Sequence, residues 1–526
     1  MDEEDVGGGS LPLGAQQQTS NDTEEEEHFQ QVCKAYQQYA TFHQTKQQGI
    51  TRRICQLINT SRQEQEISNS NISPSNSEDT QQHPTIESIL PPSLHPQSST
   101  NAQHIKQYNE STIRNQYYLD CILQYSNVGT SQDVLRQRKQ ANSSQCHEVG
   151  TNTSISTFAS TIDWTTEDQI SKIDSVLKSV VRDWSLDGKE ERSVVYDRII
   201  DALERYMPLN ANGGIDEKMS CCNDDKCISN NMTNESSNSS PPRVAVPGSG
   251  LGRLAWEIYS RGYSVQGSDF SLHMLLASDF MLNGCGIPPP EGSVEEEGRQ
   301  SFKQFGICPW ISETKNVMSF EERLRTVVVP DVDPTSLLVT EEEDGRESEF
   351  TMLAGEFLHL YSHFLPENQS KANDEQHPKA QDKFHALACS FFLDTAPSLP
   401  HYLLTIYHML EEGGLLINFG PLMYHWSGHG SLLPGDADAT PSNGGNSSAY
   451  QRRNKHLDDR YLTSIDYTWE EVRYMLCQCG FEIVEEETYI PAKYTSDNKS
   501  MMKVMYDCVF MVARKKSATN CDIDNS

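Results

Sequence analysis

The sequence predicts an α/β protein built on a doubly wound sheet, with a helical extension before the sheet and long polar inserts within it. Three observations support this fold class. From Arg243 onward, short apolar runs alternate with stretches of helical periodicity, which is typical of an α/β sheet. Before that point, apolar residues recur at helical spacing. Tracts rich in Ser, Asn, Gln and Pro separate the patterned segments, and such tracts bury too little apolar surface to fold.

The composition limits the class of function. The 526 residues carry a formal net charge of −33. This charge opposes contact with phosphate backbones, so we expect no nucleic-acid partner. No apolar run reaches about 18 residues, which predicts no membrane span. The start MDEEDVGGGS lacks a secretory signal, which favours a cytoplasmic location. The 14 cysteines lack the paired spacing of a zinc site, so we expect reduced thiols and no bound metal.

The patterned segments define the expected domains. Residues 1–23 are predicted to be disordered, and residues 24–160 to form a helical region with a low-complexity insert at about 63–103. Residues 161–515 are expected to form the α/β domain, and 516–526 a tail. Because loop closure costs grow slowly with length, the polar inserts of this domain are interpreted as surface loops. They lie at about 209–241, 286–301, 340–349, 366–380 and 428–455.

The segment at 243–271, RVAVPGSGLGRLAWEIYSRGYSVQGSDFS, predicts a nucleoside-binding unit of strand, glycine turn, helix and strand. Gly248 and Gly250 let a ligand approach the backbone closely. Asp269, 21 residues after Gly248, follows the second strand and can accept hydrogen bonds from ribose hydroxyls. The dinucleotide fingerprint G-x-G-x-x-G requires a small third residue, but Arg253 stands at that position. The turn therefore favours S-adenosylmethionine over a nicotinamide cofactor; a doubly wound domain without a cofactor is the alternative.

Further strands are predicted downstream of the glycine turn. Residues 327–329 are a candidate third strand. The next apolar run ends in Glu356 and Phe357, which could hold an adenine by hydrogen bond and ring contact; the alternative is a loop acid beside a core phenylalanine. The final strands, about 481–488 and 504–513, are expected to pair as an antiparallel hairpin.

A second acid marks the same expected edge of the sheet. The apolar run at 385–394 ends in Asp394, and ligands of open α/β sheets bind outside the carboxyl ends of strands. The next strand, 415–418, leads to Tyr424 and His425, which we expect above the same edge. The alternative for Asp394 is a surface cap on the following helix.

Six ordered segments resemble the carnosine N-methyltransferase family, over roughly residues 164–515 apart from the inserts, and more weakly over 24–60. They are LKSVVRDWS (177–185), VPGSGLGRLAWEI (246–258), VPDVDP (329–334), FFLDTA (391–396), INFGPLMYHW (417–426) and YTSDNKSMMK (494–503). The resemblance implies a seven-strand class I methyltransferase (Rossmann-like) sheet. It also implies methyl transfer from S-adenosylmethionine to a ring nitrogen of the histidine in carnosine, β-alanyl-L-histidine, to give anserine.

The resemblance also implies the residues of the site. The positions implied for the cofactor are Ser179, Arg182, Gly248, Gly250, Asp269, Glu356, Phe357 and Ser390. Those implied for the dipeptide are Asp394, His425, Tyr494 and Tyr506, of which Asp394 and His425 are the candidate catalytic residues. The chain departs from the family at Ser179, Glu356, Ser390 and Val504, where Gln, Asp, Cys and an aromatic residue are common. A homodimer through the N-terminal helices and a nuclear as well as cytosolic location are also implied.

Methyl transfer to an imidazole requires alignment of the nucleophilic nitrogen with the methyl donor more than it requires activation of that nitrogen. A neutral imidazole, whose free pKa is about 6.5, is already nucleophilic at neutral pH, and alignment with the methyl donor supplies most of the acceleration. Asp394 is expected to accept a hydrogen bond from the other ring N–H, while His425 and Tyr506 position the substrate. Two alternatives remain: a methyltransferase for histidine in other peptides or proteins, and a cofactor-binding regulator without activity.

Overall fold

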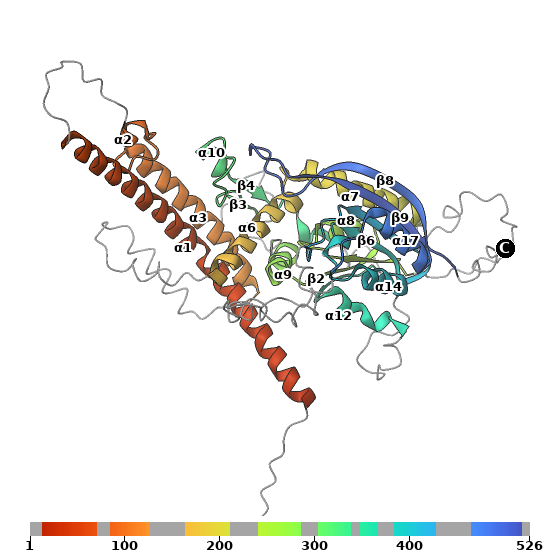
Figure 1. Ribbon diagram of the computed structural model, residues 1–526. Coiled ribbons are helices and arrows are strands. Elements are labelled where there is room, and N and C mark those ends of the chain that lie inside the picture. The colour runs from red at the N-terminus through yellow and green to blue at the C-terminus, as the bar shows by residue number, and fades with distance from the viewer. Residues whose placement is uncertain are drawn as a thin grey trace, which may run out of the picture. The chain divides into compact units, whose positions relative to one another are not determined.

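The computed structural model describes residues 13–70, 85–126, 164–210, 240–285, 303–337, 348–366, 383–427 and 464–517 (Figure 1). The chain divides into two compact units. The first is Met1–Ser179 with Gln304–Val329 and Lys499–Met502; the second is Val180–Lys303 with Pro330–Asn498 and Lys503–Ser526. The predicted polar inserts lie almost entirely outside the described residues. Within the described ranges, no helix is long and apolar enough to cross a membrane.

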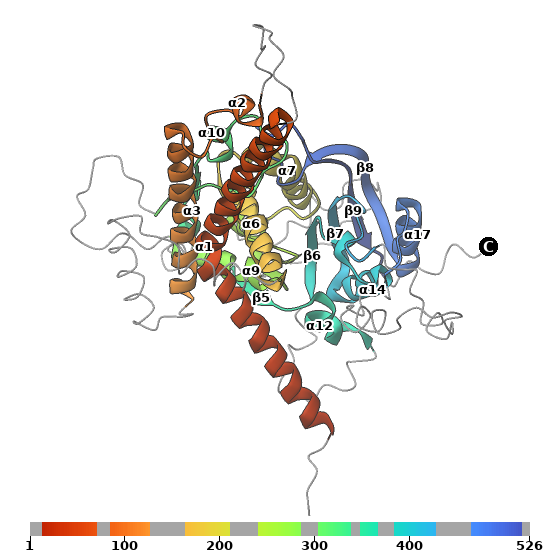
Figure 2. The same cartoon turned by 60° about the vertical axis from the view of Figure 1, so that its left-hand side comes forward.

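The first unit is mainly helical. Its long helices α1 (Leu13–Ser70) and α3 (Ser99–Tyr125) lie side by side, and Gln44 bonds Thr112 between them at 3.0 Å (Figures 1 and 2). The short α2 (Ile86–Ile89) lies between them in the sequence, and α6 (Trp164–Trp184) contributes its first part to this unit. The helical segments are longer than expected: α1 begins among residues predicted to be disordered, and both α1 and α3 extend into the predicted low-complexity insert.

The predicted third strand is wrong. Residues Val327–Val329 form β4, which pairs antiparallel with β3 (Phe305–Ile307) in a separate two-stranded sheet of the first unit. The third strand of the main sheet is β5 (Phe350–Ala354), parallel to β2. As an edge strand, β5 has no fully buried residue, although four of the five residues in its sequence FTMLA are apolar. The run of three valines gives a stronger signal, but a strand signal does not reveal the pairing partner.

The second unit contains a seven-stranded sheet in the order β5-β2-β1-β6-β7-β9-β8. Neighbouring strands are parallel from β5 to β7, whereas β9 runs antiparallel to both β7 and β8. The prediction of a sheet closed by an antiparallel hairpin is therefore confirmed. The remaining strands are β1 (Arg243–Pro247), β2 (Ser264–Asp269), β6 (Phe384–Ser390), β7 (Leu410–Gly420), β8 (Phe481–Lys493) and β9 (Met505–Lys515).

Helices cover both faces of this sheet (Figure 2). One face packs on α7 (Lys189–Tyr206) and α8 (Arg253–Ser260); the other packs on α12 (Phe357–Tyr361), α14 (Leu399–Met409) and α17 (Trp469–Cys479). Val244 and Val246 of β1 face the first layer, and Ala245 faces the second. Burial on both faces explains why the central strands read as continuous apolar runs.

The smaller elements are α9 (Leu272–Asp279), η1 (Phe280–Gly284), η2 (Pro334–Leu337), η3 (Ser362–Phe364) and η4 (Leu393–Thr395) in the second unit, and α10 (Phe320–Arg323) in the first. Because β1, β2, β5, β6 and β7 are parallel, their last residues meet at one edge of the sheet, which we call the carboxyl edge. The antiparallel β9 begins at this edge and ends at the opposite one, the amino edge.

Candidate active site

The glycine turn after β1 uses backbone conformations that favour glycine. Gly248, Gly250 and Gly252 have φ angles of +65°, +54° and +77°. A Cβ atom on Gly248 would lie 2.7 Å from Cδ2 of Phe392, so this glycine is required for packing. A Cβ atom on Gly250 would meet nothing within 4 Å. The turn therefore packs tightly at Gly248 and leaves open space beside the backbone at Gly250, where a ligand can approach.

Asp269 is the last residue of β2 and ties the turn to this strand. Its Oδ2 accepts a hydrogen bond from the backbone N–H of Gly250 at 2.9 Å, and its Oδ1 accepts from that of Ser271 at 2.9 Å. Burial raises the pKa of Asp269, and these backbone donors act in the opposite direction. Each carboxylate oxygen can accept a further hydrogen bond. These two bonds thus fix the carboxylate of Asp269, the residue predicted to bind ribose, next to the backbone of Gly250.

Arg182, at the end of α6, is fixed by its neighbour. Its Nε and Nη2 donate to the Asp183 carboxylate at 2.7 and 2.9 Å, and the Tyr196 hydroxyl donates to the same carboxylate at 2.9 Å. The guanidinium also lies over the ring of Tyr494, with Cζ 5.0 Å from the ring centroid. Two residues predicted for different ligands, Arg182 and Tyr494, are therefore in contact. Ser179 is buried on the part of α6 that belongs to the first unit.

Glu356 and Phe357 have clear structural roles. Glu356 precedes α12, and its Oε2 accepts from the backbone N–H of His359 at 2.9 Å. Its Oε1 accepts from the hydroxyl of Tyr402 at 3.3 Å. Phe357 is buried with its ring 5.2 Å from that of Phe392. These contacts agree with the alternative of a loop acid beside a core phenylalanine, and contact with an adenine stays a prediction.

Three aromatic residues gather where β6 ends and β9 begins. Ser390 closes β6, and Phe391 follows with a φ of +52°. The ring of Phe391 lies 4.8 Å from Tyr494 and 6.4 Å from Tyr506. We call Phe391, Tyr494 and Tyr506 the aromatic wall. The sequence led us to expect both tyrosines in the site but not Phe391, because an apolar residue that directly follows a buried strand is indistinguishable from core until its φ is known.

Asp394 lies on η4, three residues after Phe391 in the chain, and one oxygen of its carboxylate has no partner among the described residues. Its Oδ2 accepts from the backbone N–H of Met423 at 3.0 Å, and its backbone carbonyl accepts from the N–H of His425 at 3.0 Å. Oδ1 has no hydrogen-bond partner among the described residues, although the side chain is only 2% exposed. Burial raises the pKa of Asp394, and the Met423 N–H and His425 act against it. A buried oxygen of this kind needs a donor, and a bound ligand can supply it.

A buried ion cluster behind the glycine turn was not anticipated. Asp331 accepts a hydrogen bond from Arg253 Nη1 at 2.7 Å and another from Arg192 Nη2. Arg253 Nε also donates to Glu257 at 2.9 Å. The side chains of Arg192, Arg253 and Asp331 are almost fully buried. The arginine at the third fingerprint position thus anchors α8 to the VPDVDP segment. That motif was part of the family resemblance, but a sequence pattern alone does not reveal its ion pairs.

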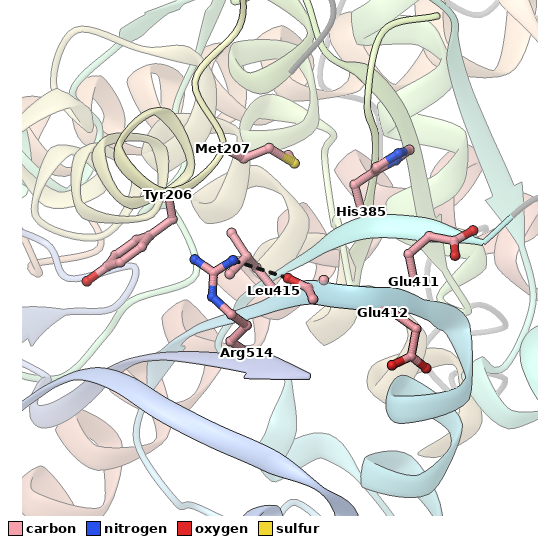
Figure 3. Close-up of a pocket in the computed structure, with 9 residues that line it drawn as sticks. Tyr206, Met207, His385, Glu411, Glu412, Leu415 and Arg514 are labelled. Atoms are coloured by element: carbon pink, nitrogen blue, oxygen red, sulfur yellow. Dashed lines mark hydrogen bonds between the residues drawn. The ribbon is translucent and has the colours of Figure 1, made fainter. Parts of the chain in front are cut away.

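A small pocket of about 100 Å³ lies at the amino edge (Figure 3). In it, Arg514 Nη1 donates to the carbonyl of Gly413 at 3.4 Å. His385 Nδ1 accepts from the backbone N–H of Arg243 at 3.0 Å, and burial lowers the pKa of His385. None of the predicted site residues lines this pocket, and ligands of such sheets bind at the other edge. Its lining is Tyr206, Met207, His385, Glu411, Glu412, Gly413, Gly414, Leu415 and Arg514.

The strand order, the glycine turn after β1 and the acid at the end of β2 define a class I S-adenosylmethionine-dependent methyltransferase. The chain belongs to the carnosine N-methyltransferase family, whose family model matches residues 159–221 and 214–517.

Curated relatives carry the same family description. Carnosine N-methyltransferase of Mus musculus is 30% identical over 344 residues, which are 65% of this chain and 63% of that protein. The Schizosaccharomyces pombe protein of that name is 29% identical over 347 residues, 66% of this chain and 71% of that protein. The match with the mouse protein thus spans less than two thirds of its length.

Solved structures show more distant likeness. Magnesium protoporphyrin IX methyltransferase from Synechocystis, with bound S-adenosylhomocysteine, is 12% identical with a TM-score of 0.23, over 53% of this chain and 75% of that one. TehB from Haemophilus influenzae is 11% identical with a TM-score of 0.25, over 53% of this chain and 58% of that one.

Proposed function

We propose that this methyltransferase transfers the methyl group of S-adenosylmethionine to an imidazole nitrogen of carnosine, giving anserine. The observation that carries the proposal is buried Asp394, whose Oδ1 has no hydrogen-bond partner among the described residues and which follows Phe391 of the aromatic wall by three positions in the chain. An apolar aromatic surface with one convergent carboxylate suits a small aromatic ring that carries an N–H donor. Family membership supports a histidine-containing dipeptide as the source of that ring.

The residues at the carboxyl edge fit the cofactor. Open space beside Gly250 admits a nucleoside to the backbone, and Asp269 keeps lone pairs for ribose hydroxyls. Arg182 supplies a positive charge suited to the carboxylate of the methionine portion. When bound, the cofactor supplies an activated methyl group on a positively charged sulfur. The protein is left with the tasks of alignment and proton handling.

Asp394 has two tasks in this proposal. Its Oδ1 accepts a hydrogen bond from the N–H of the substrate imidazole, which fixes the tautomer and leaves the lone pair of the other ring nitrogen free to attack. The methylated ring becomes an imidazolium, and the adjacent carboxylate stabilises that charge. The raised pKa of Asp394 suits it to receive the imidazolium N–H proton before product release.

The residues around Asp394 position the rest of the substrate. The aromatic wall of Phe391, Tyr494 and Tyr506 offers ring faces against which an imidazole packs. His425 is exposed and linked through its backbone to Asp394, so its side chain is available to the polar end of the dipeptide. Together they provide one apolar and one polar end for a zwitterionic substrate.

A methyl-transfer assay with labelled S-adenosylmethionine tests the proposal. Carnosine, free histidine, other histidine dipeptides and histidine-containing peptides are offered in parallel, and the products are separated against authentic anserine. Labelled anserine is the expected product. Cofactor binding without transfer to any dipeptide would reject carnosine and leave histidine in a longer peptide or protein as the acceptor. Asp394→Asn serves as the control, because it should bind the cofactor without transferring the label.

A further inference from the structure

The loop after β8 is held by one carboxylate from a distant part of the chain. Glu191, in the first turn of α7, accepts hydrogen bonds from the backbone N–H groups of Thr495 and Ser496, the latter at 3.2 Å. The two donors are consecutive, so one carboxylate with two oxygens matches them both. Burial raises the pKa of Glu191, while the positive charge of Arg182 and the two N–H donors act against that shift.

The backbone at this point is strained. Thr495 has a φ of +46°, a left-handed conformation that β-branched residues rarely adopt. Strained conformations persist only when their surroundings enforce them, and they concentrate at functional sites. The bonds from Thr495 and Ser496 to Glu191 hold the backbone directly at this turn.

The turn determines where Tyr494 points. The ring of Tyr494 lies between the Arg182 guanidinium, at 5.0 Å, and the ring of Phe391, at 4.8 Å. A change of φ at Thr495 would redirect the chain on either side of it and withdraw Tyr494 from both neighbours. Glu191 thus connects α7 to the aromatic wall without belonging to the wall itself.

We propose that Glu191 is a positioning residue for substrate binding, which acts by holding Tyr494 in the aromatic wall. The proposal rests on the proposed function, because it assigns the wall to the dipeptide. A carboxylate is required at position 191. An amide would place its NH2 group against one of the two N–H donors, so Glu191→Gln keeps the size of the side chain but loses one hydrogen bond.

The chain offers a matched control at the preceding residue. Glu190 occupies the same turn of α7, but its side chain is 79% exposed and pairs with Lys493 at 3.4 Å. Such an exposed pair contributes little to stability. Glu190→Gln therefore makes the same chemical change, with the same loss of charge, one residue away from the clamp.

The first experiment compares steady-state kinetics of the wild type, Glu191→Gln and Glu190→Gln with carnosine. For Glu191→Gln we expect kcat/KM for the dipeptide to fall by about 10- to 100-fold, the size of effect that misplacement of about 1 Å produces. Cofactor affinity, measured by calorimetric titration, should change by less than about 3-fold, and Glu190→Gln should match the wild type. Equal kinetics for the two variants, or an equal loss of cofactor affinity, would overturn the proposal.

A second variant separates positioning from a general loss of stability. Glycine adopts a φ of +46° without strain, so Thr495→Gly should restore much of the dipeptide kcat/KM when added to Glu191→Gln. If Glu191 only stabilised α7, a change at position 495 would restore nothing.

Hydrogen exchange of the peptide that contains Thr495 and Ser496 gives a readout independent of activity. Exchange should accelerate in Glu191→Gln and stay unchanged in Glu190→Gln; unchanged exchange in both would overturn the clamp. Accelerated exchange in a protein whose wild type methylates no dipeptide would reject the proposed substrate and with it the positioning role, while the clamp on the loop would stand.

Discussion

The two edges of the main sheet carry similar side chains but different backbones. The amino edge gathers an arginine, a histidine and two glutamates around a defined pocket. Among the residues that line this pocket, Gly413 alone has a positive φ, and glycine adopts that conformation without strain. The carboxyl edge and its loops hold the non-glycine residues Phe391, Tyr424, Tyr489 and Thr495 with positive φ, and a buried oxygen of Asp394 without a described partner. Charged side chains occur at both edges, whereas non-glycine residues with positive φ and a buried oxygen without a described partner mark the carboxyl edge, which is where function is proposed.

The largest expected effect follows removal of the charge at Asp394. Asp394→Asn keeps the shape of the side chain but cannot both fix the substrate tautomer and stabilise the imidazolium. We expect kcat for methyl transfer to carnosine to fall by about 10²- to 10⁴-fold, while cofactor affinity stays within about 3-fold. Single-turnover kinetics and calorimetric titration measure the two quantities. Full activity in this variant would contradict the claim that function is located at the carboxyl edge.

The same substitution should have the opposite effect on stability. Burial raises the pKa of Asp394 above its ordinary value of 3.8, so the folded protein keeps this proton at pH values where the unfolded chain has lost it. The side chain therefore costs stability as pH rises through the folded-state pKa, and the cost persists at pH 7. Melting curves from pH 4 to 7.5 should show Asp394→Asn at least as stable as the wild type at pH 7, with the gap narrowing toward pH 4.

A pair of glycine substitutions compares the two edges directly. Gly248→Ala places a methyl group 2.7 Å from Phe392 at a φ of +65°, whereas Gly413→Ala adds one at +77° with nothing within 4 Å. Both carry a backbone penalty of about 1–2 kcal/mol. Only Gly248→Ala should also displace the turn, and we expect its cofactor affinity to fall by at least about 10-fold. Thermal melts and titrations of both variants check this, and equal affinities would count against the turn as the cofactor site.

Asp269→Ala tests the other side of the turn. The substitution removes the carboxylate that accepts the hydrogen bond from the Gly250 N–H and that is also predicted to accept hydrogen bonds from ribose hydroxyls. Since a hydrogen bond to a charged group contributes about 1.5–3 kcal/mol, cofactor affinity should fall by roughly 10- to 100-fold. Saturating cofactor should restore most of kcat, because the substitution leaves Asp394 in place. A titration that shows wild-type affinity would remove Asp269 from the site.

The smallest effect is expected at the amino edge. Arg514→Ala removes one long hydrogen bond to Gly413 and opens the pocket further. We expect kcat, KM and cofactor affinity to stay within about 2-fold of the wild type, with a slight loss of melting temperature. A tenfold change in KM for carnosine would show that the amino edge contributes to function, and the comparison of edges would then fail.

The sheet and its glycine turn could be predicted from the sequence because these features are local. The order of strand, turn, helix and strand around Gly248, and the acid Asp269 that ends β2, need no knowledge of distant contacts. The expectation that a strand ends at Asp394 is wrong, because β6 ends at Ser390 and Asp394 lies on η4. Pairing partners are not local. The valines at 327–329 looked like a central strand, yet they pair in another sheet. Glu191 could not be predicted, because its partners are more than 300 residues away.

The position of Asp331 in the sequence also determines when the buried ion cluster can form during translation. Its two guanidinium partners leave the ribosome first, Arg192 by 139 residues and Arg253 by 78. Burial of a charge before its partner arrives costs about 3–5 kcal/mol. A nascent chain that ends before position 331 leaves Arg192 without this carboxylate partner and Arg253 paired with Glu257, so the buried ion cluster cannot yet form. The glycine turn and α8 are encoded in the first half of the chain, but the ion cluster behind them is complete only after the ribosome has moved well into the second half.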